Sequence, residues 1–144
     1  MRDEPERTAP LRTLDESFWD LTLRTTEGGE IALRDLRGRY VLLNFWGEWC
    51  PPCLTEIPVL VRLRYTQPDE RLFIIGILRT DEPDAARQVV EEMGMSWPQV
   101  MMTKTLRDRF RIIGYPTNIL ILPGGDRYLK AYMVSEVFFD RNLK

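Results

Sequence analysis

The stretch FWGEWCPPCLTEIP, residues 45–58, contains both cysteines of the chain. Cys50 and Cys53 are three residues apart, so on a helix they share one face and lie close enough to form a disulfide. A continuous apolar run precedes the pair, and apolar residues at helical spacing follow it. Cys50 is therefore expected at a helix N-terminus, where unpaired backbone N–H groups favour a thiolate over a thiol. A thiolate is the species that attacks disulfides.

The composition excludes several other kinds of chemistry. The chain has 144 residues, two cysteines and no histidine. A Ser-His-Asp or Cys-His nucleophile needs an imidazole, and structural zinc takes four Cys or His ligands, so neither kind of site is predicted. Twenty Lys and Arg oppose 22 Asp and Glu, and the arginines are scattered along the sequence. Nucleic acid is therefore not expected as a partner.

The length fits one domain, which we place at residues 17–144. Residues 1–16 are polar, charged and proline-containing, and we expect most of them to form a mobile tether. No apolar run approaches the roughly 18 residues of a membrane span, and no charged-then-apolar leader follows Met1. A chain trimmed of an export signal or anchor would look the same, so the sequence leaves the compartment open.

Apolar patterns along the chain predict strands that alternate with helices, which is typical of an α/β architecture with one layer of sheet covered by helices. Continuous runs such as YVLLNFW and LFIIGIL indicate strands that are buried on both faces. The predicted strands are residues 18–23 and 31–33 as a hairpin, 40–46, 72–78, 97–102, 118–122 and 127–134. The predicted helices are residues 50–65, with a bend at Pro58, 82–93, 105–110 and 136–144.

The residues around the cysteines predict a site for dithiol exchange. Attack by Cys50 on a substrate disulfide would give a mixed disulfide, which Cys53, buried behind it, would resolve. Four flanking residues are expected to contact the substrate, the two indoles by shielding one side of the site and the two prolines by stiffening its loop: Trp46, Trp49, Pro51 and Pro52. A structural disulfide, two unrelated buried thiols and a two-thiolate Cu(I) site are the competing interpretations.

A second segment, IIGYPTNILIL, supports the exchange site. Its Tyr115-Pro116 pair stands directly before a predicted strand, where a residue without an N–H is tolerated. An X-Pro bond is the one peptide bond for which the cis form costs little. A cis turn here could direct the first backbone groups of the strand toward the thiols.

Together, FWGEWCPPC, the helix proline Pro58 and GYPT before a strand resemble the thioredoxin superfamily. Within it the chain is similar to the TlpA/ResA-type thiol-disulfide oxidoreductases of the redoxin, or AhpC/TSA-like, branch. The resemblance runs from about residue 18 to 144. It implies a thioredoxin fold, with a central mixed β-sheet flanked by helices, an N-terminal β-hairpin and an inserted helix and strand. The helix at 82–93 and the strand near 97–102 match that insertion.

The resemblance also implies roles for particular residues. Pro116 is expected to be cis and to pack against the cysteine pair, with Tyr115 and Thr117 forming a groove for a substrate chain. Glu56 matches a glutamate that takes the proton from Cys53. Thioredoxins keep a buried aspartate at the position of Asn44. The alternative for Glu56 is an exposed helix residue in a surface ion pair.

The implied activity is thiol-disulfide exchange with protein thiols and disulfides, as in the reductants of cytochrome c maturation. No cofactor is expected beyond the redox-active disulfide Cys50–Cys53, and no metal. The resemblance favours a monomer outside the cytoplasm that receives electrons from a membrane partner. The rivals are a thioredoxin-fold binding module or Cu(I) carrier and a peroxiredoxin-like peroxidase. The peroxidase is disfavoured because Cys50, and not Thr or Ser, stands three residues before Cys53.

Overall fold

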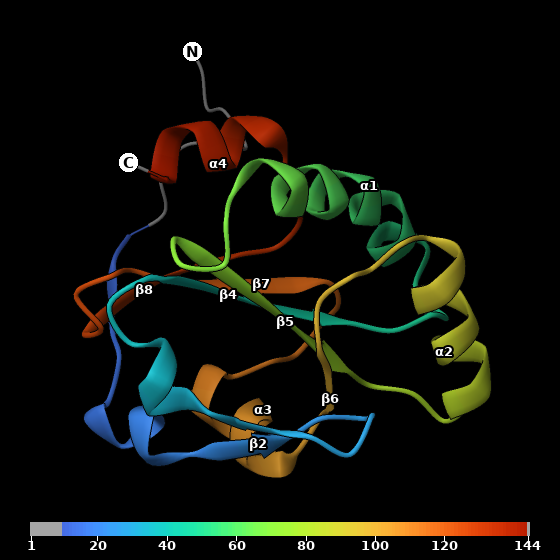
Figure 1. Ribbon diagram of the computed structural model, residues 1–144, viewed down its shortest axis with the longest axis horizontal. Coiled ribbons are helices and arrows are strands. Elements are labelled where there is room, and N and C mark those ends of the chain that lie inside the picture. Colours follow the sequence, from blue (N-terminus) through green and yellow to red (C-terminus); the bar gives the residue numbers. More distant parts are fainter. Residues whose placement is uncertain (1–9, 144) are drawn as a thin grey trace.

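A computed structural model describes residues 10–143 of the chain. Its centre is a six-stranded mixed sheet (Figure 1). In spatial order the strands are β1 (Arg12–Thr13), β8 (Arg127–Ala131), β7 (Thr117–Ile121), β4 (Tyr40–Trp46), β5 (Leu72–Leu78) and β6 (Gln99–Met101). β4 pairs in parallel with β5 and antiparallel with β7, so the strand that leads to the cysteines is central.

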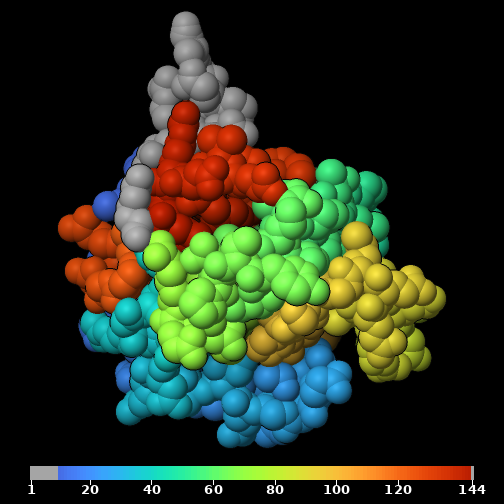
Figure 2. Space-filling model, turned by 45° about the horizontal axis from the view of Figure 1, so that its top comes forward, coloured from blue at the N-terminus to red at the C-terminus, as the bar shows by residue number. Residues whose placement is uncertain are grey.

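Helices cover both faces of this sheet (Figure 1). On one face lie α1 (Pro51–Thr66) and α4 (Glu136–Asn142), with α2 (Pro83–Glu92) beside them near β6. On the other lie α3 (Lys104–Phe110), the hairpin of β2 (Thr22–Arg24) and β3 (Glu30–Ala32), and the 3-10 helices η1 (Glu16–Asp20) and η2 (Leu33–Leu36). In Figure 2 α2 projects beyond α1 at the edge of the molecule.

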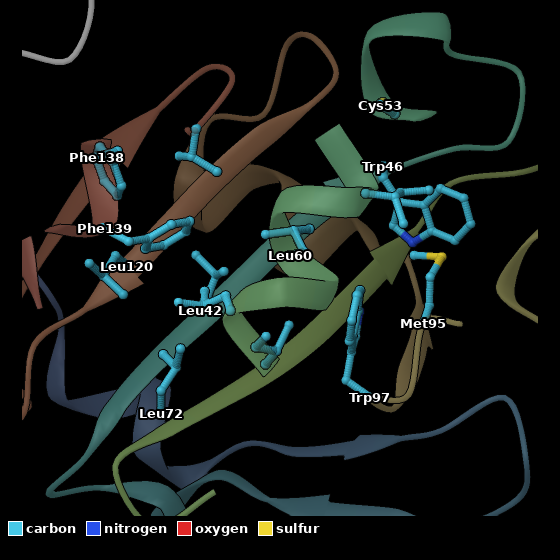
Figure 3. Packing of buried hydrophobic residues seen from close by; sticks show 14 of the residues in the cluster. Leu42, Trp46, Cys53, Leu60, Leu72, Met95, Trp97, Leu120, Phe138 and Phe139 are labelled. Atoms are coloured by element: carbon cyan, nitrogen blue, oxygen red, sulfur yellow. The ribbon is translucent and has the colours of Figure 1, made fainter. Parts of the chain in front are cut away.

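The continuous apolar run of β4 fills two cores at once. Side chains alternate across a strand, so Leu42 and Trp46 pack into the cluster beneath α1 and α4, whereas Leu43 and Phe45 pack into the cluster beneath α3. Figure 3 shows the first cluster, with Leu42 and Leu120 on neighbouring strands below Leu60 of α1. Burial on both faces fixes the position of β4 and therefore of the residues that follow it.

Most predicted elements are present, with different ends. The predicted hairpin, the buried strands, the inserted helix and strand, and the final helix capped by Ser135 are all confirmed. The last predicted strand, residues 127–134, ends at Ala131 because the chain bends at residues 132 and 133. The helix at the cysteines continues through Pro58 to Thr66. The bend expected at Pro58 stays a prediction. Among residues 10–143, no helix is long and apolar enough to cross a membrane.

The predicted strand at residues 18–23 is wrong for residues 18–21, because β2 begins at Thr22. Phe18 and Trp19 lie in η1, which Asp15 caps by accepting the backbone N–H of Ser17 at 2.8 Å. Both aromatic residues are buried, and the Trp19 indole N–H donates to the carbonyl of Gly125 at 2.7 Å. A strand would have placed these neighbours on opposite faces, whereas the helical turn buries both.

The expected tether, residues 1–16, also needs correction. Arg12 and Thr13 form β1, which pairs antiparallel with β8 at the edge of the sheet. Leu14 is buried, and its backbone N–H donates to the carbonyl of Asp126 at 2.9 Å. Residues 12–16 therefore belong to the folded domain. Residues 1–9 lie outside the described part of the chain.

Candidate active site

The cysteine pair sits where β4 delivers the chain to the start of α1. Cys50 is the N-cap of the helix, and its sulfur accepts the backbone N–H of Cys53 at 3.3 Å. The two residues are disulfide-bonded, with their Cα atoms 5.3 Å apart. Pro51 and Pro52 occupy the first turn, where a helix needs no backbone N–H donor. The predicted placement of the pair at a helix N-terminus is thus confirmed.

The two cysteines differ little in exposure. Cys50 is 4% exposed and Cys53 is 1% exposed. Cys50 is therefore more buried than the partly exposed thiol that we expected, although it remains the more accessible of the two.

Trp46 does not shield the site from outside, which corrects the sequence prediction. Its side chain is fully buried, and its indole N–H donates to Oε1 of Gln99 on β6 at 2.8 Å. Figure 3 shows Trp46 below Cys53, with Met95 on the other side of the indole. Trp46 is a core residue that supports the start of the cysteine turn.

Trp49 lies at the surface of the site and is 47% exposed. Its indole N–H donates to the carbonyl of Arg79 at 2.8 Å, and the Arg79 guanidinium carbon lies 5.8 Å from its ring centroid. The Tyr115 ring meets Trp49 edge-on, with centroids 5.4 Å apart. These contacts join the cysteine loop to the loop before β7 and present an aromatic surface to solvent.

The Tyr115-Pro116 bond is cis, as predicted. Pro116 is buried, and Thr117 begins β7 opposite Phe45 of β4. The Thr117 hydroxyl donates to the carbonyl of Gly114 at 2.7 Å, which holds the turn together. Tyr115 is the one partly exposed member of the three. The contact between Pro116 and the disulfide stays a prediction.

Glu56 is a core residue, so its alternative placement in a surface ion pair is wrong. It lies on α1 three residues beyond Cys53 and is 1% exposed. Its Oε1 accepts the amide of Asn44 at 2.9 Å. Its Oε2 accepts the amide of Asn118 at 2.9 Å and the backbone N–H of Val134 at 2.7 Å.

Burial raises the pKa of Glu56 from 4.5 to about 7. The hydrogen bonds from Val134, Asn118 and Asn44 oppose this shift because they stabilise the charged form, but desolvation is the larger effect. At neutral pH the group is therefore divided between carboxylate and carboxylic acid. A carboxyl in this range can both accept and return a proton.

Sequence reasoning missed Asn118 and the loop that contains Val134. Asn118 is buried at the start of the apolar segment NILIL, and a buried amide requires hydrogen-bond partners. That signal was present in the sequence, but it did not reveal which groups the amide binds. The backbone N–H of Val134 leaves no sequence signal at all.

The described residues contain no group of three or more His, Cys, Asp and Glu side chains that could hold a metal ion. The redox-capable group in the structure is the Cys50–Cys53 disulfide itself.

Comparison with known proteins agrees with this geometry. The AhpC/TSA family model matches residues 14–125. Thiol-disulfide oxidoreductase ResA of Halalkalibacterium halodurans is 34% identical over 113 residues, 77% of this chain and 64% of that protein. ResA of Bacillus subtilis is 31% identical over 107 residues, 74% of this chain and 60% of that protein. The chain thus spans about three fifths of the length of these relatives.

Solved structures show the same fold. A thioredoxin-family thiol:disulfide interchange protein from Chlorobium tepidum matches with a TM-score of 0.76 and 25% identity, covering 94% of this chain and 93% of that one. A secreted disulfide oxidoreductase from Mycobacterium tuberculosis matches with a TM-score of 0.71 and 20% identity, covering 83% and 92%. With its thioredoxin-like sheet and the family match over most of its length, the chain belongs to the AhpC/TSA family.

Proposed function

We propose that the chain is a thiol-disulfide oxidoreductase that exchanges the Cys50–Cys53 disulfide with protein thiols and disulfides. The observation that carries this proposal is the position of the pair. The Cys50 sulfur caps α1 and accepts a backbone N–H, an environment that stabilises a thiolate, and a buried carboxyl follows one turn later. The relatives named ResA support the same activity.

In the reducing direction, the Cys50 thiolate attacks a substrate disulfide and forms a mixed disulfide, and one substrate sulfur leaves as a thiolate. Glu56 takes the proton of the Cys53 thiol. The Cys53 thiolate then attacks the Cys50 sulfur, and the second substrate sulfur leaves. The substrate gains two electrons and the enzyme pair becomes a disulfide. The reverse sequence oxidises a dithiol substrate.

The groups around the pair suggest how a protein substrate docks. Trp49 and Tyr115 offer an exposed aromatic surface beside the disulfide, and Pro51 is exposed at the start of α1. We assign the docking surface to these three residues together with the half-buried Pro52, and we propose that the buried residues Pro116 and Thr117 shape the turn behind it. Tyrosine and tryptophan are favoured at protein interfaces because they bury large areas with few rotatable bonds.

We further propose that the protein acts outside the cytoplasm as a monomeric reductant of the cytochrome c maturation type, without a separate cofactor. A membrane protein would then regenerate its thiols. The likeness to a secreted disulfide oxidoreductase and the ResA relatives support this part of the proposal.

Trapping of a mixed disulfide tests the activity and the order of the two cysteines. Reduced Cys53→Ser protein mixed with insulin that has its native disulfides should accumulate a covalent complex through Cys50. The complex would be visible by non-reducing electrophoresis and located by mass spectrometry. The matched variant Cys50→Ser should trap little, because Cys53 lacks the N-cap position that stabilises a thiolate at Cys50. Absence of any complex would contradict the activity, and trapping through Cys53 alone would reverse the assigned order.

A further inference from the structure

The two strands beneath α1 each place one asparagine under Glu56. Asn44 of β4 and Asn118 of β7 are directly opposite in the antiparallel register, so their side chains lie on the same face of the sheet. Each is 1% exposed. The Asn44 amide donates to Oδ1 of Asn118 at 2.9 Å, which orients the second amide. The two amides are polar groups that lie beneath Glu56 inside an otherwise apolar cluster.

Asn118 uses both of its amide hydrogens to connect separate parts of the fold. Its Nδ2 donates to Oε2 of Glu56 at 2.9 Å and to the carbonyl of Tyr132 at 2.7 Å. Tyr132 begins the loop of residues 132–134, and Val134 of the same loop donates its backbone N–H to Glu56 Oε2 at 2.7 Å. Asn118 therefore joins β7, α1 and this loop at the carboxyl group.

The direction of these hydrogen bonds decides which form of Glu56 they favour. Asn44, Asn118 and Val134 all donate to the carboxyl oxygens. A carboxylate accepts from all three, whereas a carboxylic acid would turn an O–H toward one of these donors. The three donors are uncharged groups. The titratable neighbour of Glu56 on α1 is Cys53, once the disulfide is reduced. The donors therefore oppose the effect of burial, which favours the acid.

We propose that Asn118 is a positioning residue of the exchange site, which holds the Glu56 carboxyl as an ionised proton acceptor and ties it to the loop of residues 132–134. This assignment rests on the proposed exchange function. In the resolving step, the Glu56 carboxylate removes the proton from the Cys53 thiol. The freed electron pair attacks the Cys50 sulfur, and the bond from that sulfur to the substrate breaks.

Replacement of Asn118 by Leu tests this proposal, because Leu has a similar size and cannot donate. Carbon-13 NMR of the Glu56 carboxyl in the oxidised protein should show a pKa above that of the wild type. A rise of one pH unit, from about 7 to about 8, would lower the ionised fraction at pH 7 about fivefold. The acid limb of the pH profile for resolution of the mixed disulfide should move to higher pH with the carboxyl.

Two further variants make the result specific. Asn118→Ser is the second variant, for use if Asn118→Leu does not fold. Its hydroxyl is too short to replace the amide that reaches Glu56 at 2.9 Å, so it should also raise the Glu56 pKa. Asn142→Leu is the matched control: Asn142 of α4 is also buried, but its amide donates to the carbonyl of Phe138 at 2.7 Å. This control should leave the Glu56 pKa unchanged.

An unchanged or lowered Glu56 pKa in both Asn118 variants would overturn the assignment. An equal shift in Asn142→Leu would also overturn it, because the effect would then reflect general loosening of the core. The NMR titration needs no substrate. A wild-type protein without exchange activity would therefore refute the proposed function, while the titration would still decide whether Asn118 holds the carboxylate.

Discussion

Replacement of Glu56 by Gln should remove a large part of the pH dependence of stability. Burial raises the pKa of Glu56 from 4.5 to about 7, so the folded protein holds a proton on this group that the unfolded chain releases. Stability from this group is complete below pH 4.5 and is lost as the pH rises toward 7 and above. A shift of this size corresponds to about 3 kcal/mol, of which roughly 2–3 kcal/mol falls between pH 5 and pH 8.

Urea unfolding at pH 5, 6, 7 and 8 measures this effect. The protein is kept oxidised, so that neither cysteine titrates. The free energy of unfolding of the wild type should fall relative to that of Glu56→Gln by roughly 2–3 kcal/mol over this range. The Gln amide would face one of the donors around it, which costs about 1–3 kcal/mol at every pH. The slope with pH, and not the absolute difference, is therefore the test.

Glu91→Gln provides the control, because Glu91 is exposed on α2. This variant should follow the wild-type curve. Parallel curves for the wild type and Glu56→Gln would contradict a raised pKa of Glu56, since they would mean that Glu56 has the same proton affinity in the folded and unfolded states.

Three other substitutions separate docking from core packing. Trp49→Ala should raise the KM for a protein disulfide several-fold with little loss of stability, because Trp49 is half-exposed; an unchanged KM would contradict its place in the docking surface. Trp46→Phe should instead lower the free energy of unfolding by about 1–3 kcal/mol, because Oε1 of Gln99 loses its donor, and wild-type stability in urea would contradict this. Gly76→Ala should lower the free energy of unfolding by about 1–3 kcal/mol, and with it the melting temperature, because the added Cβ would overlap the Gln99 amide. An unchanged melting temperature would show that Gln99 moves aside freely.

The central strands and the cysteine turn could be predicted because their causes are local. The apolar run of residues 40–46 leaves no solvent-facing side, so a central strand is the arrangement that buries it. The i, i+3 spacing of Cys50 and Cys53, with two prolines between them, fits the first turn of a helix. These features depend on residues that are adjacent in the sequence, and the structure confirms them.

The errors arose where burial depends on distant partners. Phe18 and Trp19 read as part of an alternating strand, but the Trp19 indole finds its acceptor at Gly125, more than a hundred residues away. Trp46 and Trp49 looked equivalent beside the cysteines, yet only Trp46 ends a buried strand. Periodicity indicates which side chains are buried and does not identify what they contact.

The environment of Glu56 shows the same limit. Its place on α1 relative to Cys53 follows from the sequence, but its burial depends on segments that are distant in the sequence. The donors that surround it come from β4, β7 and the loop after β8. No local pattern brings these three segments together.

A redox titration of the Cys50–Cys53 pair is the most direct test of exchange, because exchange requires a disulfide that opens and closes in the folded protein. The protein is equilibrated in glutathione buffers, extended to lower potential with dithiothreitol, and followed by tryptophan fluorescence and by trapping of free thiols. We expect one reversible two-electron transition of the folded protein, and its midpoint will show whether the pair donates or accepts electrons. A disulfide that stays closed until the protein unfolds, or reduced thiols that bind Cu(I) and do not exchange, would contradict it.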